Sequence, residues 1–148
     1  FDAKGKDNLG QIRAELRNLM TEKVGVFRIE KGIQEAIEAL KELKERACRT
    51  ALSCEGLIMN PDLIQRWEVD SLLINAMVIA TGALNRKESR GGHFRDDFPE
   101  RNDDFHFHTL AYMTNYGEVR IGRRAVDMSL FKAKEGHYEK FGVIERKY

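Results

Sequence analysis

The sequence has almost no excess charge of either sign. Its 148 residues contain 25 Lys and Arg against 24 Asp and Glu, which leaves a net charge of +1. A protein that binds nucleic acid or an anionic membrane mainly through electrostatics carries a clear positive surplus. We therefore expect no nucleic-acid partner.

Cysteine is also scarce, with two residues, Cys48 and Cys54. They stand six positions apart in a stretch with helical character, where their side chains would point in different directions. A disulfide framework of the kind found in small secreted proteins is therefore not predicted. Two reduced thiols fit a cytoplasmic protein.

Long apolar runs are missing. The longest, residues 71–84, is too short to span a bilayer and contains Asn75 and Thr81. We expect no direct insertion into a membrane. No basic-then-apolar signal peptide opens the chain, and it begins with Phe1 rather than Met, so we expect a piece cut from a longer protein.

Common cofactor and catalytic motifs are missing too. The sequence has no GxGxxG, no GxxxxGK followed by Ser or Thr, and no HExxH. A loop that cradles phosphate and a helix that presents two zinc ligands are therefore not predicted. We assign no catalytic, cofactor-binding or metal-binding residue in this chain.

What is present is a globular composition with helical periodicity. Hydrophobic residues make up 42% and charged residues 33% of a chain long enough for one domain with a real core. Apolar residues recur at helical spacing in three stretches. The first follows a capping residue, Asn8; the second runs from Ile33 to Ala47; the third starts at Asn60 and Pro61.

The third stretch has a broad apolar front, which predicts a helix buried on more than one side. We expect it to run to about Glu88 and to end at Gly91 and Gly92. The period then changes to two in residues 107–113 and 119–126, with turn residues between them, which predicts a β-hairpin.

The predicted fold is therefore mainly α. A three-helix bundle of the spectrin-repeat type is followed by a charged loop, a small β-hairpin and an irregular tail from Asp127 to Tyr148. We place the bundle in residues 1–90 and the loop, hairpin and tail in residues 91–148 of the same domain.

A densely charged stretch, residues 86–110, raises the question of function, because 14 of its 25 residues are Arg, Lys, Glu, Asp or His. Imidazole and carboxylate groups can hold zinc or a similar ion. The candidates here are His93, Asp96, Asp97, Asp103, Asp104, His106 and His108. No known ligand spacing accompanies them, so surface hydrogen bonds or ion pairs explain the same residues.

Catalysis is a weaker interpretation of this stretch. Ser89 could serve as a nucleophile beside a histidine and an aspartate, but no GxSxG turn surrounds it. A capping or solvent-facing serine explains Ser89 equally well.

Two binding roles remain for the stretch. Five cations favour a nucleic-acid surface, but interleaved acids would cancel much of their field; the cations are Arg86, Lys87, Arg90, Arg95 and Arg101. Mixed charges and aromatic anchors are typical of a protein–protein docking surface. The aromatic residues could equally cover the helices from outside; they are Phe94, Phe98, Phe105 and Phe107.

From Glu88 onward, the order ESRGGHFRDDFPERNDD followed by HTL resembles the C-terminal domain of the flavoprotein subunit of succinate dehydrogenase and fumarate reductase. Members of that family carry a segment of the form ESRGAHxREDYPxRDD and then HTL. Gly92 stands where alanine is usual, and Phe98 replaces tyrosine. L-Aspartate oxidase is a relative with a similar domain, but it typically lacks an arginine matching Arg95 and the HTL segment.

The resemblance extends over nearly the whole chain. Residues 24–36 resemble the family's VGIFRTEEGL region, and residues 145–148, ERKY, resemble its usual terminus. Gly142 and Val143 replace a frequent Pro-Pro pair, which puts the docking of the tail in doubt.

This resemblance implies a domain that is not catalytic by itself. FAD would bind in an N-terminal domain of the parent protein, and the present domain would pack on that flavin domain, near an iron–sulfur subunit. The parent complex would lie in the cytoplasm, at the inner face of the cytoplasmic membrane. The residues expected to form ion pairs across the interdomain interface are Arg86, Glu88, Arg90, His93, Arg95, Asp97 and Arg101.

Three other hypotheses are carried forward. The chain could be the C-terminal domain of an L-aspartate oxidase, or a free-standing protein-interaction module with another partner. A small metalloprotein would instead use His93, His106 and His108.

Overall fold

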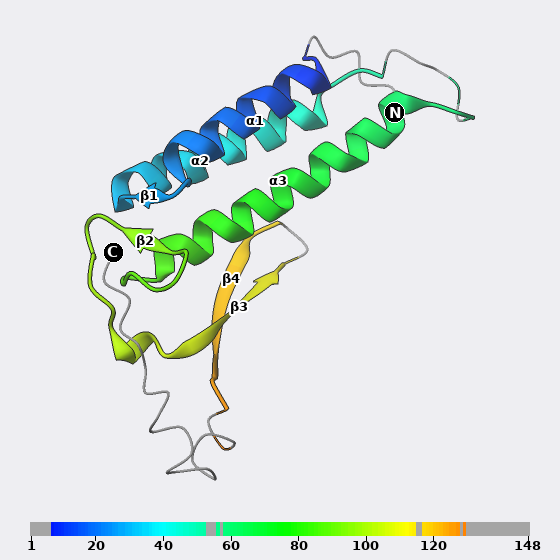
Figure 1. Cartoon of the computed structure of the whole chain (residues 1–148). Coiled ribbons are helices and arrows are strands. Elements are labelled where there is room, and N and C mark those ends of the chain that lie inside the picture. Colours follow the sequence, from blue (N-terminus) through cyan, green and yellow to red (C-terminus); the bar gives the residue numbers. More distant parts are fainter. Residues whose placement is uncertain (1–6, 53–55, 57, 115–116, 128, 130–148) are drawn as a thin grey trace.

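The structure is a computed structural model of the chain. It describes residues 7–52, 56, 58–114, 117–127 and 129. Three helices lie side by side and make up most of it (Figure 1). They are α1 (Leu9–Lys23), α2 (Glu30–Cys48) and α3 (Pro61–Asn85).

Side-chain caps begin two of the helices, as the sequence predicts. The Asn8 side chain accepts hydrogen bonds from the N–H groups of Gly10 and Gln11, and Asn60 accepts one from Leu63 at 3.1 Å. Each bond satisfies N–H groups that have no partner within the helix.

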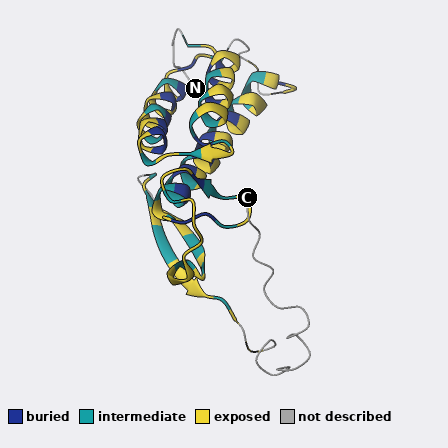
Figure 2. Cartoon of the chain, turned by 60° about the vertical axis from the view of Figure 1, so that its left-hand side comes forward, coloured by how far each residue is buried: buried dark blue, intermediate teal, exposed yellow. Residues whose placement is uncertain are grey.

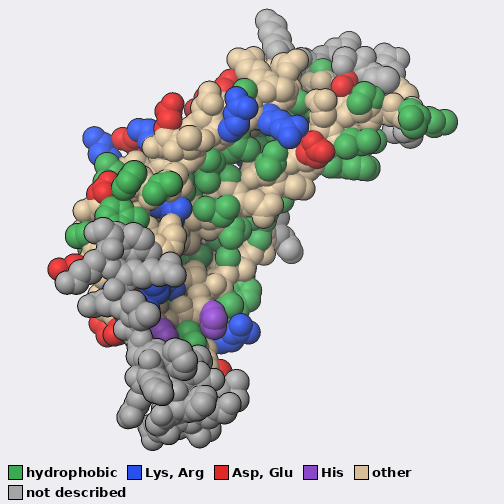
Figure 3. Space-filling model, viewed as in Figure 1, with side chains coloured by type: hydrophobic (Ala, Val, Ile, Leu, Met, Phe, Trp, Pro, Cys, Tyr) green, Lys and Arg blue, Asp and Glu red, His purple; other side chains and the backbone are tan. Residues whose placement is uncertain are grey.

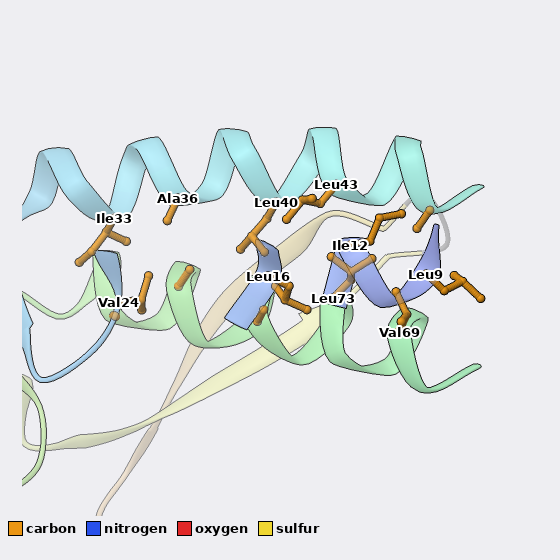
Figure 4. Close-up of a cluster of buried hydrophobic side chains, with 14 residues drawn as sticks. Leu9, Ile12, Leu16, Val24, Ile33, Ala36, Leu40, Leu43, Val69 and Leu73 are labelled. Carbon is orange, nitrogen blue, oxygen red and sulfur yellow. The ribbon is translucent and has the colours of Figure 1, made fainter. Parts of the chain in front are cut away.

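One hydrophobic core joins the three helices, because each presents an apolar stripe to the other two. Figure 4 shows these side chains pointing into the space between the helices. The largest of them are Leu9, Ile12, Leu16, Val24, Ile33, Leu40, Leu43, Val69 and Leu73.

The outer side of α3 departs from the prediction. Its inner side is buried, but Ile64, Trp67 and Ile79 are 56%, 60% and 51% exposed. The prediction of a helix buried on more than one side is therefore wrong within this chain, because the buried residues of α3 form a single stripe along the helix.

The end of α3 also differs from the prediction of Glu88. The helix ends at Asn85, and Arg86 already has extended backbone angles (φ −88°, ψ 103°). From that point the chain turns so that the side chains of Arg86 and Glu88 meet each other in an ion pair.

The predicted hairpin is present. Strands β3 (Phe107–Met113) and β4 (Val119–Ala125) pair antiparallel, with Phe107 opposite Ala125 and Met113 opposite Val119. The hairpin lies against α3 (Figure 1).

A second, smaller pairing has no counterpart in the prediction. Two-residue strands β1 (Phe27–Arg28) and β2 (Phe94–Arg95) pair in parallel, which places the segment after α1 beside the charged stretch. A short 3₁₀ turn, η1 (Asp103–Phe105), precedes β3.

The coarse prediction, a mainly helical chain with a small antiparallel sheet, is confirmed. The spectrin-repeat type of bundle and the division at residue 90 stay predictions. Cys48 is an exposed free thiol. Cys54 and residues 130–148, most of the predicted irregular tail, lie outside the described residues.

α3 is 25 residues long, and by length and composition alone it could cross a membrane. The apolar run of residues 71–84 covers only part of this helix, which begins ten residues earlier. Core helices of water-soluble proteins meet the same criteria, and α3 packs against both α1 and α2. The finding therefore does not assign α3 to a bilayer.

Candidate functional site

The charged loop, residues 86–106 between α3 and β3, lies where three helix ends come together. These are the C-termini of α1 and α3 and the N-terminus of α2 (Figure 1). Figure 2 shows buried positions among the helices and again in this loop. The buried charged side chains of the loop must therefore find partners inside the protein.

Arg95 is the centre of the loop, and its side chain is fully buried. One guanidinium nitrogen donates to the carbonyl oxygens of Ala83 (3.1 Å) and Leu84 (3.4 Å), in the last turn of α3. A cation is favourable there because carbonyl oxygens without helical partners give a helix C-terminus a partial negative charge. The guanidinium also lies 5.0 Å from the centre of the Phe98 ring.

Asp97 connects this arginine to the start of α2. Its two carboxylate oxygens each accept a 2.7 Å hydrogen bond from Arg95, a bidentate ion pair. One of the same oxygens accepts the N–H of Glu30 (2.9 Å), the first residue of α2. Ile29, the residue before α2, offers no side-chain cap, so Asp97 supplies the missing acceptor from 67 positions away. Hydrogen bonds from Arg95 lower the pKa of Asp97 to about 2.

Glu88 is the second fully buried charge. Arg86 and Arg90 both donate to its carboxylate, and the N–H of Asn102 adds a third donor at 3.0 Å. Burial by itself raises the pKa of Glu88, but these hydrogen bonds outweigh it and keep the pKa below its ordinary value. The carboxylate therefore stays charged and ties the start of the loop to its end.

Arg86 binds the segment that leads into the hairpin. Its guanidinium donates to the carbonyl oxygens of Phe105 and Phe107, both at 2.8 Å, and to the Thr109 hydroxyl at 3.1 Å. The guanidinium groups of Arg86 and Arg123 lie 5.0 and 4.5 Å from the centre of the Phe107 ring. These phenylalanines therefore stack on arginines of the same chain.

Gly91 and Gly92 make the tight turn of the loop. The backbones of Arg90 and His93 exchange hydrogen bonds of 2.8 and 3.1 Å across it. Gly91 has φ +61°, the left-handed region that favours glycine. The turn directs His93 back toward the end of α3.

His93 lies between Arg28 and the end of α3. Its Nδ1 is 2.8 Å from a guanidinium nitrogen of Arg28, and its Nε2 is 3.1 Å from the carbonyl oxygen of Arg86. A guanidinium can only donate, so Nδ1 accepts and Nε2 carries the proton that goes to the carbonyl. Burial lowers the pKa of His93, and the charges of Arg28, Arg95 and Arg86 lower it further. The imidazole is therefore neutral.

Ser89 stabilises the loop from within. Its hydroxyl lies 2.8 Å from the carbonyl oxygen of Phe98, to which it donates, and accepts the N–H of Arg95 at 2.9 Å. The hydroxyl is thus hydrogen-bonded to backbone groups on both sides, which fits a structural serine rather than a nucleophile.

The metal hypothesis also finds no site. Within the part of the chain that the structure describes, no group of three or more His, Cys, Asp or Glu side chains could hold a metal ion. His93 is bonded to Arg28 and to the Arg86 carbonyl oxygen, which leaves no free nitrogen for a ligand.

The centre of the charged loop does not face water. Glu88 and Arg95 are buried, and their ionic partners belong to this same chain. Only the rim of the loop is open, notably Arg101, which pairs with the exposed Asp103. The role of the seven charged residues in docking another domain stays a prediction.

Sequence reasoning missed two members of the site. Arg28 reaches His93 and also donates to the carbonyl oxygens of Val24 and Gly25 at the end of α1. Glu30 lies 3.6 Å from Arg95. Both follow α1, far from the charged loop in sequence, and no local pattern signals the β1–β2 pairing that brings them there.

Known proteins are similar to this chain in sequence. Residues 13–148 match the family described as fumarate reductase flavoprotein C-term. The fumarate reductase flavoprotein subunit of Haemophilus influenzae is 37% identical over 119 residues, which cover 80% of this chain and 20% of that protein.

This chain belongs to the fumarate reductase flavoprotein C-terminal family. The family predicted from the ESRGGHFR segment is thereby confirmed. The mitochondrial succinate dehydrogenase flavoprotein subunit of Oryza sativa is also similar, 35% identical over 86% of this chain and 20% of the rice protein. The chain spans about a fifth of the length of these flavoprotein relatives.

Solved structures share the fold of this family member. A mutant form of E. coli quinol fumarate reductase FrdA matches with a TM-score of 0.81 and 34% identity, over 84% of this chain and 22% of the other. Adenylylsulfate reductase from Archaeoglobus fulgidus matches with a TM-score of 0.72 over 95% of this chain and 20% of the other, but at 23% identity it shows only a common fold.

Proposed function

We propose that this chain is the non-catalytic C-terminal part of an FAD-dependent subunit that interconverts succinate and fumarate. The names of its relatives support the reaction, and its length, about a fifth of theirs, supports a partial role.

One observation carries the structural role. The buried charges of the charged loop are neutralised within the chain by helix ends and by one another, as Arg95 and Glu88 show. A catalytic site instead keeps polar groups available for a substrate. The loop therefore acts as a clamp that fixes three helix ends.

FAD is expected to bind outside this chain. Among the described residues, every buried side-chain nitrogen and oxygen already has a hydrogen-bond partner. Because this chain spans only about a fifth of the length of its flavoprotein relatives, the flavin-binding domain would lie in the remainder of the parent subunit.

We also propose that the charged loop packs on that flavin-binding domain, near an iron–sulfur subunit. The buried members of the seven-residue set, such as Arg95 and Glu88, would hold the shape of the loop. The more exposed Arg90 and Arg101, at 29% and 37%, would provide the contacts. The parent complex would lie in the cytoplasm, at the inner face of the membrane, without direct insertion of this domain.

The test compares the 148-residue chain with the full-length subunit. We expect the chain alone to be colourless and unable to reduce a dye with succinate, and the full-length subunit to carry flavin and to show this activity. Turnover of succinate by the chain alone would refute the proposal, as would a full-length subunit without flavin.

A further inference from the structure

A pocket opens between α2, α3 and the β-hairpin, with a volume of about 300 Å³. We call it the hairpin pocket and define it by Leu40 and Lys44 of α2, Leu73, Ile74 and Met77 of α3, and Met113 of β3. Figure 3 shows hydrophobic side chains gathered over α3 and along its border with α1, so apolar surface on α3 is not confined to this pocket. The hairpin pocket differs because the hairpin supplies a third wall beside the two helices.

The interior of the hairpin pocket is apolar. Leu40 and Leu73 are 1% and 3% exposed, whereas Ile74 and Met113 are 42% and 38% exposed. The methionine side chains are flexible, so these walls can adapt to the shape of a ligand. An apolar cavity of about 150 Å³ is large enough to bind benzene. The hairpin pocket therefore has room for an apolar group larger than one ring.

Charged groups line the pocket too, and cations outnumber anions among them. They are Lys44, Arg66 and Asp70. Arg66 donates to Asp70 and to the Thr50 hydroxyl, each at 3.0 Å, so the charges of Arg66 and Asp70 offset each other. Lys44 therefore supplies the surplus positive charge of the pocket.

The turn of the hairpin leaves room for the Lys44 ammonium group at the edge of the pocket. Gly117 has no side chain, and a Cβ at this position would collide with Nζ of Lys44. Gly117 also has φ +79°, in the left-handed region that favours glycine. One glycine therefore both forms the turn and lets the cation lie beside an apolar interior.

We propose that the hairpin pocket binds a small monocarboxylate whose apolar body has ~8–10 carbon atoms, with its carboxylate on Lys44. Ligand sites are mostly apolar clefts of about 300–1,000 Å³ in which a few polar groups fix the orientation. One surplus positive charge matches one carboxylate, and an ion pair of this kind is a strong hydrogen bond. The pocket lies outside the charged loop, and its ligand does not depend on the proposed function.

Other small molecules fit the pocket less well. A dicarboxylate such as succinate has no apolar body to place against Leu40 and Leu73. A neutral alcohol or hydrocarbon would fill the interior but would offer Lys44 no charge. A phospholipid with two long chains exceeds the volume of the pocket.

The test uses octanoate as the ligand and Cys48, an exposed thiol that lines the pocket, as the reporter. Cys54→Ser makes Cys48 the single thiol of the 148-residue chain, which is first checked for cooperative unfolding. Alkylation of Cys48 by iodoacetamide is followed by mass spectrometry, at octanoate concentrations below those that form micelles. We expect saturating octanoate to slow alkylation about fivefold or more, because a bound ligand covers the wall of its site.

Two lysines of α2 give matched variants. Lys44→Gln removes the cation of the pocket and should weaken octanoate binding about tenfold. Lys41→Gln removes an exposed cation that pairs with Glu38 outside the pocket, and it should leave the affinity unchanged. 1-Octanol has the same chain length without the charge. It should bind more weakly than octanoate to the wild type and equally well to both variants.

Calorimetric titration of the full-length subunit with octanoate repeats the comparison of wild type and Lys44→Gln. We expect the same tenfold loss of affinity in this larger protein, and no competition between octanoate and succinate. Agreement between the two proteins supports a site that belongs to this domain.

Each other outcome overturns the proposal. Constant alkylation of Cys48 at all octanoate concentrations means that the pocket does not bind this ligand. Equal affinities for octanoate and 1-octanol mean an apolar pocket without a carboxylate site, and equal losses in the two lysine variants mean unspecific attraction. Protection of Cys48 that rises with protein concentration, without octanoate, means that a second copy fills the pocket. Binding to the 148-residue chain but not to the full-length subunit means that another part of the subunit covers it.

Discussion

At the scale of single residues, Arg95 makes several stabilising contacts with one side chain. Its guanidinium binds the last carbonyl groups of α3 and pairs with Asp97, which in turn caps α2. Each of these contacts uses the same buried positive charge, so removal of that charge breaks them together.

We therefore expect Arg95→Ala to lower the free energy of unfolding by about 3–5 kcal/mol, the usual cost of breaking a buried ion pair. Arg101→Ala is the matched control and should cost about 0.5 kcal/mol or less, because Arg101 pairs with Asp103 in water. Nothing in the sequence around Arg95 signals that its side chain is buried. Urea unfolding of the chain measures both, and equal costs would contradict the clamp.

His93 makes stability depend on pH. Its pKa in the folded chain is below the ordinary value of 6.5, so protonation favours the unfolded chain. Its contribution is complete above pH 6.5 and is lost as the pH falls through the folded pKa. A protonated imidazole would place a second cation 2.8 Å from Arg28.

The check is the urea midpoint between pH 8 and pH 5. We expect the wild-type midpoint to decline toward acid and His93→Gln to decline less. His108→Gln, at an exposed position of β3, is the control and should keep the wild-type slope. If the urea midpoint of His93→Gln fell with pH as steeply as that of the wild type, groups other than His93 would cause the decline.

At the scale of elements, the Gly91–Gly92 turn decides whether the charged loop can close. Gly91 has a positive φ, and a Cβ at either glycine would meet no atom within 4 Å. Backbone strain alone should therefore make Gly91→Ala cost about 1–2 kcal/mol, and Gly92→Ala should be nearly neutral. Thermal unfolding of the two variants separates them, and equal melting temperatures would contradict the turn geometry.

Sequence patterns predicted the elements that depend on local signals. Asn8 and Asn60 stand at helix starts, and the period of two marks β3 and β4. The patterns failed where contacts with residues distant in the sequence determine the structure. Just past the end of α3, the Arg86 side chain binds Glu88 and the Phe105 carbonyl oxygen, and neither partner follows from helical periodicity.

The site was predicted only in part, again because residues distant in the sequence complete it. Density of charge and the family resemblance drew attention to Arg95 and His93, but not to their burial. Arg28 lies 65 positions from His93, and only the β1–β2 pairing joins them. The open side of α3 was also misjudged, because an apolar front looks the same in the sequence whether or not the folded chain covers it.

At the scale of the whole molecule, side-chain contacts of the charged loop connect the helix ends with the entrance of the hairpin. Glu88 holds Arg86 and Arg90, Arg86 holds the entry to β3, and Arg95 with Asp97 holds α2 and α3. Loss of one buried charge should therefore loosen distant amides together with near ones.

Hydrogen exchange of Glu88→Gln tests this coupling. A loss of about 3 kcal/mol on breaking a buried pair corresponds to roughly a hundredfold faster exchange through the shared opening. We expect that acceleration at the Asn102 amide, which donates to Glu88 directly, and equally at the Glu30 amide, which is bonded through Asp97. The Leu63 amide, capped by Asn60 at the start of α3, is the distant control and should respond less. Acceleration confined to Asn102 would mean that the ion pairs act singly, and the charged loop would then be a set of local contacts rather than a clamp.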